Sequence, residues 1–253
     1  MGSTISIEGL LGASTVGSEI ERSVLNKLEE EYQENKSSVR ESLAEALTKA
    51  YKAVFKPSPV ERQTLADAVA VASKGKILEE GAGNDTMYQL VQERTTPDRY
   101  IRSDLSENQL NQVDAVGTEN LVYNGSRHDL QDGDVDITFS KCVLHHIDNG
   151  SEEGREKNRI DYLKEQQRIV RPGGVVITMD VVDPSKGNLK SKFWHNVKHR
   201  LILGEEEHHF LTTDGAMDLY RKAGFENITG QEVETYKGTY FMVSGQKCAD
   251  MGS

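Results

Sequence analysis

The chain has 253 residues, of which 30 are basic and 41 acidic, so its formal net charge at pH 7 is -11 with histidine neutral. A chain of this length has room for one large α/β domain or two small ones, with a substantial buried core. The acidic excess argues against a protein that binds duplex nucleic acid or an anionic membrane, because both surfaces attract basic side chains. Net charge alone does not exclude a nucleic-acid substrate held by a local basic patch.

Cysteine content and hydropathy indicate the compartment. Cys142 and Cys248 are too few for a disulfide framework, so we expect reduced thiols. The first residues lack a basic region that leads into a long apolar core, and no stretch approaches the about 20 apolar residues of a spanning helix. We therefore expect a cytoplasmic protein without a membrane partner.

Residues 1–75 are predicted to be helical. A serine is followed three residues later by a glutamate, the pattern of a capping box, at Ser18–Glu21, Ser38–Glu41 and Ser58–Glu61. Behind the first two boxes apolar residues recur at helical spacing, and the third box has Pro59 in the first turn and precedes an apolar run over 65–72. This N-terminal helical cap either covers a core or acts as a lid over an active site, and the pattern fits both.

From Lys76 onward, short apolar strands alternate with helical segments. The predicted strands cover 76–80, 99–103, 120–123, 135–140, 174–182, 226–230 and 239–244. Predicted helices include 151–170 and one that follows Thr213. This alternation is typical of a parallel sheet with helices on both faces and right-handed crossovers. We expect 76–253 to form the second domain, with an insertion at 184–212 that covers a substrate site.

The turn after the first predicted strand is Gly81-Ala82-Gly83. Glycines let the backbone approach a ligand closely, and the N-terminus of a following helix adds a positive field. Many α/β proteins use glycine there only to turn the chain. Asp104 follows the second strand, where a carboxylate can accept hydrogen bonds from both ribose hydroxyls or simply cap a helix near Ser106.

A resemblance to a known family rests on several segments. In chain order they are ILEEGAGND, RSDLSENQL, GSRHDL, VDITFSKCVLHHI, RIVRPGGVVI and FLTTDGAMDLYRKAGF. In order and spacing they resemble the class I S-adenosylmethionine-dependent methyltransferases, from Lys76 to Gly245. The resemblance implies a Rossmann-like α/β fold, with a seven-stranded, mostly parallel sheet whose last strand is antiparallel, and S-adenosylmethionine as the cofactor.

The resemblance also implies which residues hold the cofactor. They are the strand-ending acid Glu79, the loop residues Gly81, Ala82 and Gly83, the ribose ligand Asp104, and Leu105 beside the adenine. Ser126 and Arg127 match the positions that read the adenine, and Ser140 and Lys141 lie near the methionine moiety.

Two residues depart from the family pattern: Asp85 replaces the third glycine of the loop, and Ser126 replaces an aspartate. Serine can still accept a hydrogen bond from an amino group, without charge assistance. Asp85 weakens the alternative of a nicotinamide dehydrogenase, because a pyrophosphate would meet its negative charge, and Thr86 stands where that fingerprint has glycine. Asp85 can also cap the following helix.

Methyl transfer from a sulfonium requires a nucleophile held in line, and a general base only when the nucleophile arrives protonated. His145 and His146 follow the fourth strand, at the sheet edge where ligands of open α/β sheets bind. His145 is our candidate for the general base or a substrate contact, and His146 for a substrate contact.

The insertion carries further candidates. Trp194 either forms the floor of a substrate pocket or packs in a core. His195 and His199 share a helix face and, with His208 and His209, could bind a metal or line a polar substrate wall. We favour the wall, with Trp194, His195, His199 and His209 as substrate contacts and no metal.

These patterns predict an enzyme that transfers a methyl group to an oxygen, nitrogen or carbon atom of a small molecule. Its only expected partners are that acceptor and, in a homodimer, a second copy; a monomer is equally compatible, and no nucleic acid is expected. The alternative is a protein of the same fold that binds S-adenosylmethionine without methyl transfer, for another reaction or as an interaction module.

Overall fold

A computed structural model describes residues 60–72, 75–123, 127–147, 151–182, 210–235 and 238–249, which belong to a single structural unit. The predicted cap helices before Val60 and residues 183–209 of the insertion lie outside this part of the chain. So do five predicted site residues: Ser126, Trp194, His195, His199 and His209.

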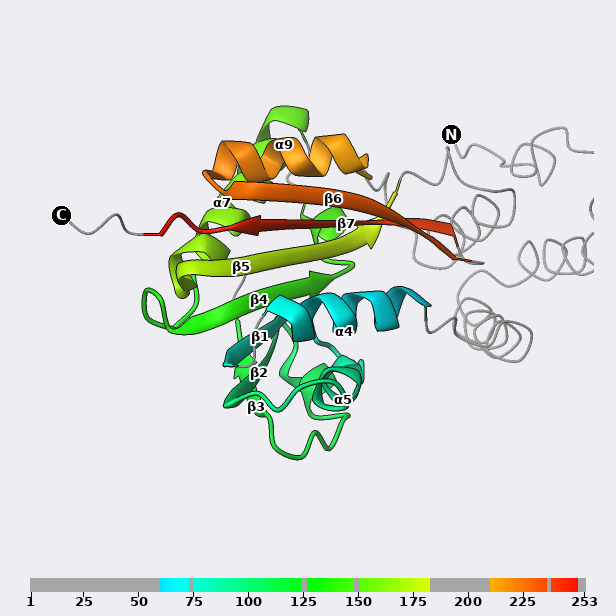
Figure 1. Ribbon diagram of the computed structural model, residues 1–253, viewed down its shortest axis with the longest axis vertical. Helices are drawn as coiled ribbons and strands as arrows, with labels where there is room; N and C mark the ends of the chain where they lie inside the picture. Colours follow the sequence, from blue (N-terminus) through cyan, green and yellow to red (C-terminus); the bar gives the residue numbers. More distant parts are fainter. Residues whose placement is uncertain are drawn as a thin grey trace, which may run out of the picture. The chain divides into compact units, whose positions relative to one another are not determined.

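The described residues form a seven-stranded sheet with the order β3-β2-β1-β4-β5-β7-β6 (Figure 1). The strands are β1 (Lys76–Glu80), β2 (Arg99–Asp104), β3 (Glu119–Val122), β4 (Val135–Lys141), β5 (Val170–Val181), β6 (Glu226–Thr235) and β7 (Gly238–Gln246). Strands β1 to β5 pair in parallel, whereas β7 pairs antiparallel with both β5 and β6. The prediction of a mostly parallel sheet with an antiparallel last strand is confirmed.

Helices pack on both faces of this sheet because successive strand residues point to opposite faces. The helical elements are α4 (Val60–Ala72), α5 (Met87–Gln92), α6 (Glu107–Leu110), the 3-10 turn η1 (Leu144–His146), α7 (Glu152–Ile169) and α9 (Thr213–Ala223). Ile77 of β1 and Ile177 of β5 lie in the core under α4 and α5. Their neighbours in the same strands, Leu78 and Val176, point to the other face and lie in the core under α7 and α9. Each face therefore has its own apolar core.

The boundaries of the long helices follow from capping side chains. The Ser151 hydroxyl accepts a hydrogen bond from Gly154 N at 3.2 Å, which starts α7. The Thr212 hydroxyl accepts one from Gly215 N at 3.1 Å and starts α9. Gly224, with φ of 90°, ends α9 in the left-handed conformation that glycine adopts at little cost.

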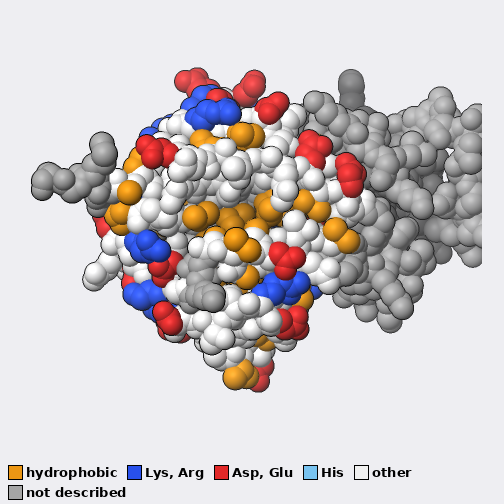
Figure 2. Space-filling view, viewed as in Figure 1, with side chains coloured by type: hydrophobic (Ala, Val, Ile, Leu, Met, Phe, Trp, Pro, Cys, Tyr) orange, Lys and Arg blue, Asp and Glu red, His pale blue; other side chains and the backbone are white. Residues whose placement is uncertain are grey.

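Helix α4, which the sequence pattern assigned to the N-terminal cap, packs against the sheet. Leu65 and Val69 of α4 are buried with Phe139 of β4 and Met179 of β5. An open groove of about 640 Å³ runs between α4 and the antiparallel end of the sheet. Apolar side chains gather along this face (Figure 2), but none of the predicted site residues lines the groove.

None of the helices in the described ranges combines the length and hydropathy that a membrane span requires.

Candidate active site

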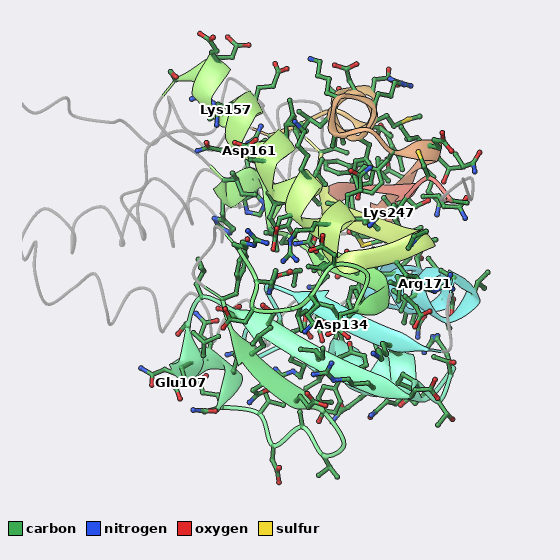
Figure 3. The ribbon with its side chains drawn as sticks, turned by 90° about the vertical axis from the view of Figure 1, so that its left-hand side faces the viewer. Glu107, Asp134, Lys157, Asp161, Arg171 and Lys247 are labelled. Atoms are coloured by element: carbon green, nitrogen blue, oxygen red, sulfur yellow. The ribbon has the colours of Figure 1, made fainter. Side chains whose placement is uncertain are left out.

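The site lies where β2, β1, β4 and β5 end, because these neighbouring strands are parallel and their carboxyl ends share one edge. Figure 3 shows Glu107, which follows the carboxyl end of β2, at the opposite end of the sheet from Arg171 at the start of β5. Open α/β sheets bind ligands in the crevice at the carboxyl edge.

The loop after β1 has room only for glycine at two positions. Gly81 and Gly83 have φ of 64° and 49°. A Cβ on Gly81 would lie 2.5 Å from Cγ2 of Val143, and one on Gly83 would lie 2.9 Å from Oε1 of Gln109. Ala82, buried between them, donates its N–H to Ser103 O at 2.9 Å. The loop is thus held against the end of β2, with Gly81 exposed to solvent and Ala82 and Gly83 buried.

Asp104 lies beside this loop at the end of β2. Its Oδ2 accepts a hydrogen bond from Gly83 N at 2.8 Å, and its Oδ1 accepts one from Ser106 N at 2.9 Å. The cap of α6 is Ser106 itself, whose hydroxyl accepts from Gln109 N at 3.3 Å. Asp104 is therefore not the helix cap. The side chain of Leu105 is unusually exposed for an apolar residue, at 68%. A fixed carboxylate next to an exposed apolar surface fits an adenosine, through its ribose hydroxyls and its base.

Arg102, two residues before Asp104, was not singled out from the sequence. It is 0% exposed, and its Nη2 donates to Gly83 O at 2.8 Å. Its Nη1 contacts Oδ1 of Asn120 at 3.4 Å. Hydrogen bonds from its two terminal nitrogens offset part of the cost of burying the charge, so Arg102 holds the underside of the loop. Its signal in the sequence was a charged residue inside an otherwise buried strand.

Glu79 is buried at the end of β1, with 3% exposure, and accepts a hydrogen bond from Tyr100 Oη at 2.8 Å. Burial, assisted by the negative charge of Asp85, raises the pKa of Glu79 to about 8, although the Tyr100 hydrogen bond opposes this shift. Near neutral pH this carboxyl group is therefore mostly protonated.

Asp85, which stands where the resemblance predicts the third glycine of the loop, forms two ion pairs. Its carboxylate lies 2.7 Å from Nη2 of Arg62 on α4 and 3.0 Å from Nζ of Lys141 at the end of β4. Burial alone would raise the pKa of Asp85, but Lys141 and Arg62 together hold it below its ordinary value. Asp85 also accepts a hydrogen bond from Thr86 N at 2.6 Å, at the start of α5.

His145 and Asp180 form a buried pair where β4 and β5 end. His145 Nδ1 lies 2.6 Å from Asp180 Oδ1, and the His145 backbone N–H donates to Oδ2 at 3.1 Å. Because a carboxylate only accepts hydrogen bonds, Nδ1 carries the proton. The rings of His146 and Phe210 lie 3.9 and 5.7 Å from the His145 ring, between centroids. Asp180 was missed in the sequence, although an acidic residue that ends an apolar strand was a usable signal.

The remaining predicted residues differ in their placement. Lys141 lies in the Asp85 cluster, whereas the buried Ser140 hydroxyl contacts Oγ1 of Thr178 at 3.4 Å, within the sheet. Arg127 is exposed after residues 124–126, which the structure does not describe. The next residue, His128, is buried, paired with Glu80 and stacked on Tyr123, and was not predicted.

Within the described ranges, no group of three or more histidine, cysteine, aspartate or glutamate side chains has a metal-binding arrangement. The histidines at 195, 199, 208 and 209 lie outside those ranges.

Residues 78–178 match a family model described as a methyltransferase domain. The matched range begins in β1 and ends in β5, so it contains the glycine loop, Asp104 and His145.

Solved structures share the fold at low sequence identity. A SAM-dependent methyltransferase from Methanosarcina mazei has a TM-score of 0.53 at 16% identity, over 72% of this chain and 98% of that chain. The CurJ carbon methyltransferase has a TM-score of 0.56 at 16% identity, over 80% of this chain and 58% of that chain. Phosphoethanolamine N-methyltransferase 2 from Haemonchus contortus has a TM-score of 0.54 at 13% identity, over 74% of this chain and 52% of that chain. It was solved with phosphomonomethylethanolamine and S-adenosylhomocysteine. This chain therefore spans less than two thirds of the length of the last two proteins.

A comparison with curated proteins found no match. The matched methyltransferase domain, the seven-stranded sheet and the glycine loop beside Asp104 agree with one another. Residues 78–178 are therefore a methyltransferase domain with a class I methyltransferase fold, which supports an enzyme with S-adenosylmethionine as its cofactor.

Proposed function

We propose that this enzyme methylates an oxygen, nitrogen or carbon atom of a small molecule, and that His145 removes the proton from the acceptor. The observation that carries this proposal is the buried His145–Asp180 pair at the carboxyl edge of the sheet. The pair adjoins the cofactor loop, because Val143, two residues before His145, packs against Gly81. When bound, S-adenosylmethionine supplies a methyl group on a positively charged sulfur.

The chemistry of His145 follows from its partner. The Nδ1–H is engaged by Asp180, so proton transfer takes place at Nε2. The Asp180 carboxylate stabilises the imidazolium that forms when Nε2 takes a proton. Asp180 is itself fixed by the backbone N–H of Val181 at 2.7 Å and by that of His145. The ring therefore keeps one tautomer and one orientation.

A small acceptor agrees with several features of the chain. Its net charge of -11 disfavours nucleic acid as a partner. One protein of the same fold was solved with the small amine phosphomonomethylethanolamine, and another is a carbon methyltransferase. We propose that residues 1–75 and the insertion at 184–212 cover the acceptor, with His146, Trp194, His195, His199 and His209 as contacts. The same proposal places the enzyme in the cytoplasm, as a monomer or homodimer, without a metal.

The test is transfer of radiolabelled methyl from S-adenosylmethionine to a panel of small hydroxyl, amine and activated-carbon acceptors. With an acceptor in hand, His145→Asn should lower kcat by about 10²- to 10⁴-fold, the usual contribution of a general base. The affinity for S-adenosylhomocysteine should stay unchanged, because His145 is assigned to the acceptor. A kcat that keeps its wild-type value across the pH range would remove the proposed role of His145.

A second candidate function rests on Asp85. A negative charge in the cofactor loop is compatible with a protein that binds S-adenosylmethionine for a reaction other than methyl transfer or as an interaction module. In the same labelling experiment, cofactor that binds but is never consumed with any acceptor would favour this candidate.

A further inference from the structure

Three charged side chains from three separate elements meet beside the cofactor loop. Arg62 comes from α4, Asp85 from the loop after β1, and Lys141 from the end of β4. Arg62 also donates from Nη2 to Oγ1 of Thr86 at 2.8 Å, next to Asp85. All three side chains keep about a quarter of their surface exposed, at 24%, 27% and 24%. The cluster is therefore fixed in place but open to a ligand.

The order of strands places this cluster at one end of the bound cofactor. Asp104 and Leu105 mark the nucleoside at the end of β2. Strand β1 is the next neighbour, and β4, which ends in Lys141, is the one after. Two strand spacings are about 10 Å, the reach of an extended chain from the ribose to an amino-acid end group. A bound cofactor with its nucleoside at Asp104 would therefore reach the cluster with its tail, which carries an α-carboxylate and an α-ammonium.

We propose that Asp85 is a specificity-determining residue for this tail. By occupying Arg62 and Lys141, its carboxylate weakens binding of the ligand's α-carboxylate and strengthens binding of its α-ammonium. The three side chains have a net charge of +1 with Asp85 and +2 without it. Removal of the Asp85 charge therefore shifts the preference of the site toward carboxylate.

The carboxyl group of Glu79 does not replace Asp85 as a negative partner for the α-ammonium at neutral pH. Glu79 shares the site with Asp85 and Lys141, but burial raises its pKa to about 8. Lys141 and Arg62 keep Asp85 ionised by lowering its pKa. Asp85 is thus the carboxylate that faces the tail in its charged form.

The test is isothermal titration calorimetry of Asp85→Asn with four nucleosides. These are S-adenosylhomocysteine, its decarboxylated analogue, its deaminated analogue and 5′-methylthioadenosine, which lacks both groups. Asparagine can still accept the hydrogen bond from Thr86 N, so we expect the variant to fold. Relative to wild type, it should bind the deaminated analogue about fivefold more tightly and the decarboxylated analogue about fivefold more weakly, the upper end for one partly exposed charge contact. Binding of 5′-methylthioadenosine should not change.

Two further variants make the result decisive. Asp98→Asn removes the same charge from an exposed site at the amino end of β2 and should leave all four affinities unchanged. Arg62→Gln should weaken binding of the two ligands with a carboxylate, the opposite sign to Asp85→Asn. If Asp85→Asn changes all four affinities by the same factor, or weakens the deaminated analogue, the proposal is overturned.

Discussion

Glu79, a buried acid that we expect in the cofactor site, makes the stability of the fold depend on pH. The ordinary pKa of a glutamate side chain, which applies to the unfolded chain, is 4.5, and burial raises it to about 8 in the folded protein. The stability that this difference provides is fully present below pH 4.5 and is lost as the pH rises through 8, because the folded protein must then bury a charge.

Glu79→Gln removes this dependence, because glutamine is neutral and can still accept the hydrogen bond from Tyr100. We expect wild type and variant to have similar melting temperatures at pH 5, and the variant to be more stable at pH 9. Thermal unfolding of the ligand-free proteins at both pH values checks this. A difference in melting temperature that stays the same at both pH values would refute the burial of a neutral Glu79.

At the scale of single residues, the sequence predicts the side chains whose place in the fold follows from their position at the end of a strand. Gly81 and Gly83 follow β1 and Asp104 is the last residue of β2, so their positions along the chain place them at the carboxyl edge. Asp180 and Arg102 were missed because their roles depend on partners that the fold brings together. Asp180 meets His145 only where the ends of β4 and β5 adjoin, and Arg102 meets the loop only when β2 lies beside β1.

Among the elements, the packing of α9 on the sheet depends on a glycine in β7. A Cβ at Gly245 would lie 2.7 Å from Cδ1 of Tyr220 and 2.9 Å from Cβ of Phe225. Both aromatic residues are buried, so neither can move without opening the core.

Gly245→Ala should therefore lower the free energy of unfolding by about 1–3 kcal/mol, the usual cost of overpacking a core. Gly215→Ala is the matched control, since a Cβ there would lie 3.3 Å from Thr212 Oγ1, in the first turn of α9. Alanine favours a helix over glycine by up to about 1 kcal/mol, so this variant should be neutral or slightly stabilised. Urea denaturation measures both, and equal effects of the two substitutions would argue against the close contact at Gly245.

The elements themselves were largely predictable, and the errors at their ends have identifiable causes. Strand β6 was predicted to stop at Gly230 but continues to Thr235. Gly230 does not break the strand; it makes room for α9, since a Cβ there would lie 2.7 Å from Sδ of Met217. Strand β5 was predicted to start at Gly174 but begins at Val170, because Val170 pairs with Val135 ahead of an irregularity in the register.

For the whole molecule, we expect ligand binding and folding to be coupled, because the residues that we propose for the cofactor site come from loops after different strands. A ligand at 100 times its Kd stabilises the folded state by about 2.7 kcal/mol. S-adenosylhomocysteine at that concentration should raise the melting temperature of the wild type. Asp104→Asn should lose most of this increase, because the ribose loses its charged partner. An equal increase in both proteins would contradict the assignment of Asp104.

The position of β7 in the sheet also determines the order in which the protein can assemble. Strand β7 follows β6 in the chain but lies between β5 and β6. While the polypeptide is being synthesised, the edge of β5 stays unpaired until the residues up to Gln246 have left the ribosome. Exposed strand edges promote association between nascent chains. The sheet is therefore incomplete from the synthesis of β5 to that of β7, and over this interval the nascent chain carries an open strand edge in the middle of its final sheet.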